Sequence, residues 1–279
     1  RESANALDLD VTSPQNDNCN PNAGVIAATG RYGTAPYTYQ YLLDTDPAPT
    51  ATSAGWTSSS SANVEAGDYM VYVMDAYGCI QSETITVLED PSPEISLVVV
   101  DECVDEGQFQ VTITLDNAAV AMAPFQISVN GSAYQAFTFD GSDQYTISGL
   151  SSGTNQSVSV RDLNGCSDSE TFDIYPPLEF NVIQTVALDC EPGNLAYGEL
   201  QIEVLSGSGN YEFEIDGPDP YNEPRGALTL DASNQFTWAG AGAAGSYVVL
   251  VYDIGTTAPY CSQSITVDVP DAPLPSFTS

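Results

Sequence analysis

The sequence contains no lysine and no histidine, and its only basic residues are four arginines. Against these stand 38 acidic residues, so the formal net charge is −34. Such a surface repels DNA, RNA and anionic lipid headgroups, because proteins bind these polyanions through clustered cations. Nucleic-acid binding is therefore excluded. The same charge favours solubility and attracts divalent cations or cationic partners.

The absence of lysine and histidine also makes catalytic groups scarce. Without histidine or lysine there is no conventional catalytic triad and no lysine for a Schiff base. A carboxylate pair of the glycosidase type is the one arrangement that the composition leaves open, because acidic residues occur throughout the chain. We therefore expect a protein that is not an enzyme.

Long apolar runs and helical periodicity are also missing. No segment reaches the roughly eighteen apolar residues of a membrane-spanning helix, so no membrane insertion is expected. No apolar period of 3.6 residues persists, and the helix content should be very low. Hydrophobic residues nevertheless make up 42% of the chain and aromatic residues 10%. This is enough apolar surface to fold.

The chain is organised around residues 67–79, with the sequence GDYMVYVMDAYGC. Tyr69, Val71 and Val73 fall on one face at a period of two, and Asp68, Met70, Tyr72 and Met74 fall on the other, which is the pattern of a strand. The segment from Asp75 to Cys79 then reads as a tight turn, with an aspartate that caps its own backbone. Related segments end in cysteine at 166 and 261, with capping aspartates at Asp162 and Asp253; an insertion delays the last cysteine.

These copies divide the chain into repeat one (1–90), repeat two (91–175) and a divergent repeat three (176–270), with 271–279 as a linker to a further repeat. Proline-rich joints separate them, because proline fixes its own φ and restricts the preceding residue. About seven short strands per repeat predict an all-β fold of three tandem immunoglobulin-like antiparallel sandwiches. The chain lacks an initiator methionine and a signal peptide, so we expect it to be a processed part of a longer protein.

The six cysteines provide two per repeat. Repetition of the same local position favours pairing within each repeat, as Cys19–Cys79, Cys103–Cys166 and Cys190–Cys261. Each bridge would pin one end of its sandwich, leave no free thiol, and stabilise its domain by ~4 kcal/mol. Disulfides imply an oxidising, extracellular environment. The alternative of metal thiolates lacks a C-x-x-C spacing.

Acidic residues gather near the joints and the first cysteine of each repeat. Carboxylates that repel one another at a joint would need bridging cations, and calcium prefers such oxygen ligands. The candidate calcium ligands are Asp17, Glu89, Asp90, Asp101, Glu102, Asp105, Glu106, Asp189 and Glu191. The alternative is a solvated acidic surface. Asp75, Asp162 and Asp253 are expected to cap their turns rather than to bind calcium.

A strand in repeat one carries Tyr37, Tyr39 and Tyr41 at alternate positions. Aromatic faces stack on the apolar faces of sugars, so these side chains are candidate contacts for a cell-surface glycan. The alternative is packing in the core and across strands.

Three features of repeat one, namely Cys19 with Gly24, the segment PYTYQY at 36–41, and AGDYMVYVMDAYGC ending at Cys79, resemble the SprB-type repeat of gliding adhesins on the surface of Bacteroidetes bacteria. Repeats two and three keep parts of this pattern, including Asp162, Cys166, Asp253 and Cys261. The resemblance implies secretion by the type 9 route, display in a long surface filament or adhesin, and no enzymatic activity.

Our first hypothesis is therefore a non-catalytic spacer of an extracellular adhesin or filament at the cell surface. Its partners would be neighbouring repeats of the same chain and a glycan or protein on another cell. One alternative is a region that self-assembles into a fibre or hook. Another is an array of carbohydrate-binding modules.

Overall fold

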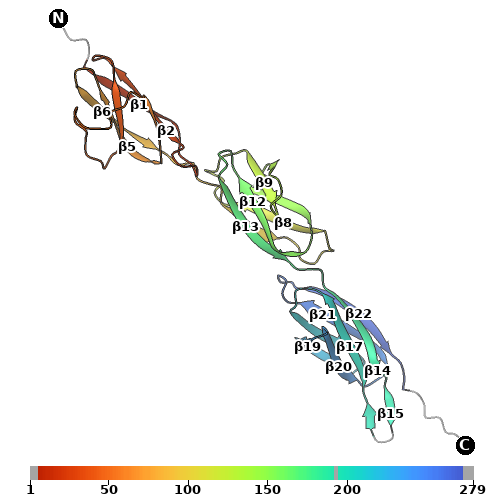
Figure 1. Ribbon diagram of the computed structural model, residues 1–279. Helices are drawn as coiled ribbons and strands as arrows, with labels where there is room; N and C mark the ends of the chain where they lie inside the picture. Colours follow the sequence, from red (N-terminus) through yellow and green to blue (C-terminus); the bar gives the residue numbers. More distant parts are fainter. Residues whose placement is uncertain (1–5, 192–193, 273–279) are drawn as a thin grey trace, which may run out of the picture. The chain divides into compact units, whose positions relative to one another are not determined.

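The structure is a computed structural model that describes residues 6–191 and 194–272, without the side chains of 190–196. Within these ranges the regular elements are strands, numbered β1 to β22, and the sheets are antiparallel (Figure 1). No helix in the described ranges is long and apolar enough to span a membrane. The fold is therefore all-β, as the missing helical periodicity predicts.

The chain divides into two compact units. Unit 1 comprises Arg1–Ser96, Thr114–Gln144 and Ser157–Glu170, and unit 2 comprises Leu97–Ile113, Tyr145–Gln156 and Thr171–Ser279. Each sheet draws its strands from a single predicted repeat, although the units divide the strands of repeat two. The division into three domains stays a prediction.

Repeat one is a sandwich of two three-stranded sheets with the orders β1-β2-β4 and β3-β5-β6. Its strands are β1 (Asp8–Gln15), β2 (Gly24–Arg31), β3 (Thr38–Leu43), β4 (Ser61–Val64), β5 (Gly67–Met74) and β6 (Ile80–Val87). The predicted alternation in β5 is confirmed, because Tyr69, Val71 and Val73 are buried in the core between the sheets. From the first sheet, Leu9 and Ile26 join them.

The first and last strands of repeat one run in the same direction and end together. Beyond them, Asp17 and Glu89 form an isolated parallel bridge. The Asp17 N–H donates to the Leu88 carbonyl, and the Asp90 N–H donates to the Asp17 carbonyl, both at 2.8 Å. We call this the exit end of the sandwich, because the chain leaves it for repeat two. The end where β1 and β6 begin is the entrance end.

Repeat two contributes a sheet with the order β10-β9-β12-β13 and a second with the order β11-β8-β7. Their bounds are β7 (Ile95–Val99), β8 (Phe109–Leu115), β9 (Phe125–Val129), β10 (Gln135–Phe137), β11 (Gln144–Leu150), β12 (Gly153–Arg161) and β13 (Ser167–Ile174). Strand β8 buries alternate side chains from Phe109 to Leu115. Such alternation is the pattern of a strand with one face in a core.

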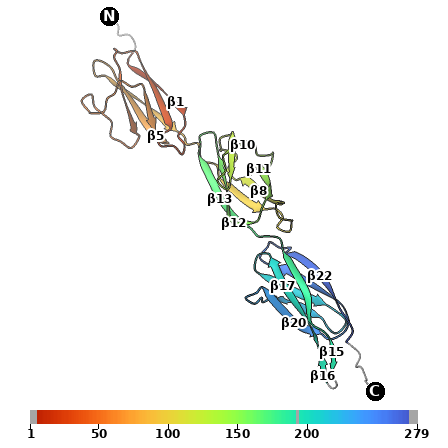
Figure 2. The same ribbon diagram turned by 45° about the vertical axis from the view of Figure 1, so that its right-hand side comes forward.

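Repeat three lies in unit 2. Its strands are β14 (Glu179–Val186), β15 (Asp189–Glu191), β16 (Asn194–Ala196), β17 (Gly198–Ser206), β18 (Tyr211–Asp216), β19 (Glu223–Ala227), β20 (Gln235–Ala241), β21 (Gly245–Asp253) and β22 (Cys261–Val269). Sheets β14-β17-β20 and β19-β18-β21-β22 enclose a core that includes Leu200, Ile202 and Tyr247. Strands β15 and β16 pair as a separate two-stranded antiparallel sheet, and both are labelled in Figure 2.

Candidate functional site

The two disulfides of the described residues join consecutive repeats. Cys19 bonds Cys166, with a Cα–Cα distance of 5.6 Å, and Cys103 bonds Cys261 at 5.2 Å. The predicted pairs Cys19–Cys79, Cys103–Cys166 and Cys190–Cys261 are therefore wrong. Cys79 is a free, exposed thiol, which also corrects the expectation that none remains. The side chain of Cys190 lies outside the described residues.

The geometry of repeat one explains why its two cysteines cannot meet. Cys19 lies two residues beyond Asp17, at the exit end of the sandwich. Cys79 directly precedes β6, at the entrance end. The 8 residues of β6 separate these ends by about 26 Å, at ~3.3 Å per residue. A disulfide instead requires Cα atoms within about 7 Å. The two cysteines lie at opposite ends of the sandwich rather than at one end.

The same logic explains the observed bonds. A leading cysteine follows the first strand of its repeat, so it lies at the exit end. A trailing cysteine precedes or begins the last strand, so it lies at the entrance end. Cys19 and Cys166 are therefore at the two ends that the chain connects directly.

Junction one, the Cys19–Cys166 site of unit 1, is closed by polar backbone contacts. The Cys19 N–H points to the Cys166 sulfur at 3.3 Å. The Asn20 side-chain amide donates to the Asn164 carbonyl at 3.1 Å. In the turn, Asp162 accepts the Cys166 N–H at 2.9 Å. Cys166 is 1% exposed, so the disulfide seals the base of this turn.

Junction two, the Cys103–Cys261 site of unit 2, uses different partners. The Thr257 N–H donates to the Glu102 carboxylate at 2.5 Å. Asp101 accepts the Cys103 N–H at 2.8 Å, and the Thr256 hydroxyl accepts the Cys261 N–H at 3.1 Å. The junction borders a cavity of about 290 Å³ lined by residues that include Val99, Val100, Ala258 and Pro259. Its polar groups are thus used to hold the two chain segments.

The turn aspartates cap their own loops. Asp75 accepts the N–H groups of Tyr77 and Cys79, each at 3.0 Å, and that of Thr34 at 3.2 Å. The bond from Cys79, followed by the other two, outweighs burial and lowers the pKa of Asp75 below 3.8. Asp253 accepts the N–H of Gly255 in its own turn at 3.2 Å, in addition to the Ser208 N–H at 2.8 Å, and lies 1% exposed. Capping, rather than metal binding, is thus the role that the contacts show.

The candidate calcium ligands are not gathered into one site. No group of three or more Asp, Glu, His or Cys in the described part of the chain is placed to hold a metal. Asp17 accepts three backbone N–H groups, from Ala23 at 2.9 Å, Gly24 at 3.2 Å and Ala66 at 2.9 Å. Burial of Asp17 raises its pKa, but these bonds and one from Asn18 outweigh it, so the pKa lies below 3.8.

The other acidic candidates lie in separate surroundings. Asp90 accepts the Asn16 side-chain amide at 2.8 Å, and Glu106 accepts the Ser152 N–H at 2.9 Å. Asp101 and Glu102 belong to junction two. Glu89, Asp105 and Asp189 are exposed, and the side chain of Glu191 lies outside the described residues.

The three tyrosines of β3 and its preceding residues pack against the core of repeat one. Tyr39 is 6% exposed, and its hydroxyl accepts the Gly30 N–H at 3.1 Å. Tyr37 and Tyr41 pack on the same core. Burial, followed by the neighbouring Tyr39, raises the pKa of Tyr41 to about 12. Tyr39 therefore has no free ring face for a sugar, whereas Tyr37 and Tyr41 are half-buried. The glycan contact at Tyr37 and Tyr41 stays a prediction.

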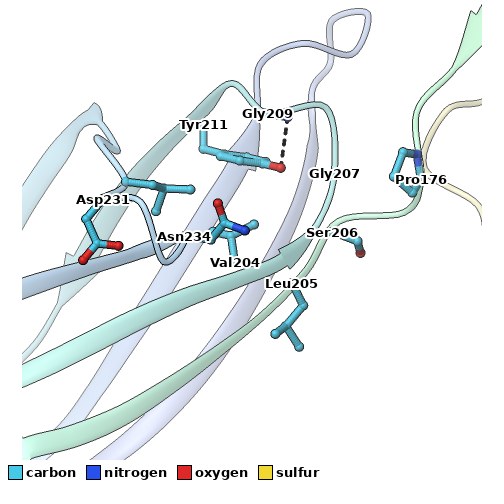
Figure 3. A pocket seen from close by; sticks show the side chains of 10 residues that line it. Pro176, Val204, Leu205, Ser206, Gly207, Gly209, Tyr211, Asp231 and Asn234 are labelled. Atoms are coloured by element: carbon cyan, nitrogen blue, oxygen red, sulfur yellow. Dashed lines mark hydrogen bonds between the residues drawn. The ribbon is translucent and has the colours of Figure 1, made fainter. Parts of the chain in front are cut away.

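Repeat three contains a hollow of about 510 Å³ between its loops (Figure 3). The groups around it serve the local structure. The Tyr211 hydroxyl accepts the Gly209 N–H at 3.0 Å, and Asp231 accepts the N–H groups of Ser233 and Gln235. No pair of carboxylates faces this hollow, since Asp231 is the one acidic residue in its lining. The disulfide junctions are therefore the stronger candidate for function.

Comparison with known proteins finds similar folds among solved structures. No family model matches it, and no curated protein matches it significantly. Among solved structures, it is similar to three N-terminal domains of the highly immunogenic outer capsid protein of bacteriophage RB49. The identity is 14%, the coverage 95% of each chain and the TM-score 0.44. It is also similar to a fragment of intimin solved with the intimin-binding domain of its receptor, at 14% identity, 64% coverage of each chain and a TM-score of 0.42.

A third similar structure contains eight immunoglobulin domains of the Down syndrome cell adhesion molecule. Its identity is 11% and its TM-score 0.40, with 95% of this chain and 42% of that chain covered.

Proposed function

We propose that this chain is a non-catalytic, load-bearing spacer in an extracellular adhesin or surface filament. The observation that carries this proposal is the pair of disulfides, each of which crosses from one repeat into the next. Disulfides within each repeat would protect single domains. Disulfides between repeats instead hold the connection itself.

The two disulfides interlock, because each has one cysteine inside the loop that the other closes. When the chain is pulled from its ends, the load divides among the covalent paths from Cys19 to Cys261. The shortest of these crosses both disulfides and contains the 63 residues between Cys103 and Cys166 (166 − 103). Without disulfides the path contains 242 residues (261 − 19).

This difference has a mechanical consequence. An extended chain spans ~3.5 Å per residue, so complete unfolding between Cys19 and Cys261 is limited to about 220 Å instead of about 850 Å. Even a fully unfolded segment would stay short and connected. Such a limit is useful in a tether between a cell and a surface, whereas it adds nothing to a freely diffusing binding module.

The finer assignment rests on the sequence. Disulfides favour an oxidising, extracellular location. The resemblance of repeat one to SprB-type repeats supports gliding or surface attachment as the process, and type 9 secretion as the route. The acidic surface, with its net charge of −34, suits a soluble and exposed filament.

Single-molecule force spectroscopy tests the proposal, with handles attached at the two ends of the chain. Two double variants provide matched controls. Cys19→Ser with Cys166→Ser leaves a shortest path of 84 residues (103 − 19), or about 290 Å. Cys103→Ser with Cys261→Ser leaves 95 residues (261 − 166), or about 330 Å.

We expect the maximum extension between Cys19 and Cys261 to increase in that order, from the unaltered chain to the fully reduced chain. Equal extension with and without reductant would overturn the load-bearing role. A maximum extension equal to that of a chain with the bonds Cys19–Cys79, Cys103–Cys166 and Cys190–Cys261 would show that the disulfides lie within repeats. It would overturn the pairing between repeats.

A further inference from the structure

Repeat two contains a hollow of about 440 Å³, and its lining residues all belong to unit 1. It lies between the loop that joins β8 to β9 and the segment that joins β10 to β11. Three phenylalanines and three alanines of the first loop contribute to its walls, namely Phe125, Phe137, Phe139, Ala118, Ala121 and Ala123. Alanine carries only a methyl group, so this loop leaves the space beside the rings unfilled.

The three phenylalanine rings pack on one another. Phe125 pairs with Phe137 across β9 and β10, and their ring centres lie 6.4 Å apart. Phe139 meets the other two rings edge to face, with centres 5.3 Å and 4.8 Å away. Phe125 is 9% exposed, whereas Phe137 and Phe139 are half-buried. The cluster is therefore an ordered apolar wall that the protein covers only in part.

Exposed apolar surface continues from the hollow onto the loop between β8 and β9. Val120 is 52% exposed, and Ala123 and Pro124 are exposed as well. Residues 117–139 contain no charged residue, although the whole chain carries 38 acidic residues. Binding sites are commonly apolar hollows with a few polar groups, and exposed apolar surface beside a hollow marks an interaction surface.

Two carboxylates border the same hollow. Asp140 and Asp143 contribute to its lining, and both residues are exposed. The Leu115 N–H donates to the Asp143 carbonyl at 2.9 Å, which fixes the acidic turn to the end of β8. Asp140 caps this turn, because its carboxylate accepts the Ser142 N–H at 2.8 Å. The hollow thus combines an apolar wall with negative charge held at its border.

A second copy of this chain does not match this charge. Its net charge is −34, and three of its four arginines are already engaged, Arg31 and Arg225 in ion pairs and Arg161 in a hydrogen bond. The ion pairs of the described residues leave Asp140 and Asp143 without an arginine. The complementary occupant is therefore cationic and comes from another molecule.

We propose that this hollow binds a segment of a partner protein in which a large apolar side chain is flanked by lysine or arginine. The apolar side chain enters the hollow against the phenylalanine wall, and the cations face Asp140 and Asp143. A sugar fits less well, because phenyl rings and methyl groups offer its hydroxyl groups no hydrogen bonds. The inference goes beyond the proposed spacer role, since it gives repeat two a partner and does not depend on the disulfides.

The test uses the purified full chain with carbon-13 labelled alanine methyl groups and follows their NMR shifts as a peptide is added. The probe is a seven-residue peptide, capped at both ends, with a central phenylalanine between two lysines. We expect saturable shifts at the methyl groups of Ala118, Ala121 and Ala123. Replacing the central phenylalanine by alanine should weaken binding at least about tenfold, because the buried ring supplies most of the affinity.

Two double variants separate the local carboxylates from the general negative charge. Asp140→Asn with Asp143→Asn should weaken binding about two- to tenfold, since each exposed ion pair contributes little. Asparagine keeps an acceptor oxygen for the turn and tolerates the φ of 58° at Asp143. Asp44→Asn with Asp46→Asn changes the charge equally on an exposed turn of repeat one, and it should leave the affinity nearly unchanged at physiological salt.

Other outcomes overturn the inference. Equal weakening in the two double variants, or equal binding of the phenylalanine and alanine peptides, would show general attraction to an acidic surface. Equal binding of a matched peptide with glutamates in place of lysines would show that the partner is not cationic. Shifts of these methyl groups with protein concentration alone would assign the hollow to a second copy, and shifts with maltoheptaose would assign it to a glycan. If no ligand moves these methyl groups, the hollow is no binding site.

Discussion

The two junctions form the same kind of bond through different turns. At junction one, the carboxylate of Asp162 accepts the N–H of the cysteine at 2.9 Å. At junction two an insertion lengthens the turn, and the Thr256 hydroxyl takes over this acceptor role at 3.1 Å. Asp253 is then free to hold a neighbouring loop through the Ser208 N–H.

This difference shows which feature the junction requires. The trailing cysteine must stand at the start of the last strand with its N–H paired, because an unpaired buried N–H costs stability. The group that pairs it can change. The turn can therefore accept an insertion without moving the cysteine away from its partner in the preceding repeat.

The largest expected effect comes from removing each disulfide. The loops that they close span 147 and 158 positions, so each should contribute about 5 kcal/mol to the free energy of unfolding of the region it closes. Because this contribution grows only with the logarithm of loop length, the two losses should agree closely. Urea unfolding of the two double serine variants measures them, with Trp56 and Trp238 fluorescence reporting on repeats one and three.

Unequal decreases in the free energy of unfolding for the two double variants would contradict this expectation. A loss at one junction only would mean that the other bond is offset by strain or by contacts that survive its removal. Reductant added to the unaltered chain provides the control, since it should reproduce the sum of the two effects.

The second-largest loss of stability is expected from removing the side chains that accept the cysteine N–H groups, Asp162 at junction one and Thr256 at junction two. Asp162→Ala should cost about 1–3 kcal/mol, because it leaves the buried Cys166 N–H without a partner. Thr256→Val should cost a similar amount at junction two for the same reason. Thermal unfolding of both variants measures this.

Asp253→Ala provides the contrast. It removes the acceptor for Ser208 and leaves the Cys261 N–H paired with Thr256. We expect destabilisation with an unchanged rate of reduction of Cys103–Cys261. An equal gain in reduction rate for Asp253→Ala and Thr256→Val would show that the acceptor role has not moved to Thr256.

The sequence is informative about strands and turns. Period-two alternation in residues 67–74 and 245–253 corresponds to β5 and β21, whose alternate side chains are buried. Asp75, Asp162 and Asp253 each accept a backbone N–H of their own turn, as the sequence predicts. No strand is predicted at β4 (Ser61–Val64), which is short and mostly polar. These features are local, and local patterns determine them.

The disulfide pairing is not local, and repetition alone could not decide it. One pair per repeat fits pairing within repeats and between them equally well. The deciding signal is the order of cysteines and strands: the leading cysteine follows the first strand, and the trailing cysteine precedes the last strand. In repeat one these strands run in the same direction, so Cys19 and Cys79 lie at opposite ends. The sequence does not predict the contact between Glu102 and Thr257, because the two residues meet only across repeats.

The turn of repeat one, from Asp75 to Cys79, has the same capping aspartate as the turns at the two junctions, but Cys79 is a free thiol. The pKa values of Asp75 and Asp17 lie below 3.8 in the folded protein. A lowered folded pKa contributes stability that is present above the unfolded pKa and is lost as the pH falls through the folded pKa. Repeat one should therefore lose stability below about pH 4.

Urea unfolding followed by Trp56 at pH 7, 5 and 3 measures this loss. The double variant Asp17→Asn with Asp75→Asn should start from a lower stability at pH 7 and decline less between pH 5 and 3. A decline as steep as that of the unaltered chain would assign the acid sensitivity to other carboxylates.

The smallest effects are expected at the arginines beside the trailing turns. Arg161, which precedes Asp162, lies 4.0 Å from the Tyr134 ring centre and donates to Gln126 at 2.7 Å. Arg225 lies 3.8 Å from the ring centre of Tyr252, which precedes Asp253, and pairs with a carboxylate at 2.6 Å.

Both arginines are accessible to solvent, so water and salt weaken these contacts. Arg161→Gln and Arg225→Gln should each lower the free energy of unfolding by less than about 1 kcal/mol. The two losses should differ in salt dependence. Arg225 loses an ion pair that salt screens, so its effect should shrink between 0.05 and 0.5 M salt, whereas Arg161 bonds a neutral amide and should change less. Thermal unfolding at these salt concentrations measures both. Equal salt dependence would mean that the Arg225 pair contributes no electrostatic stability, and that stacking on tyrosine is what the two junctions share.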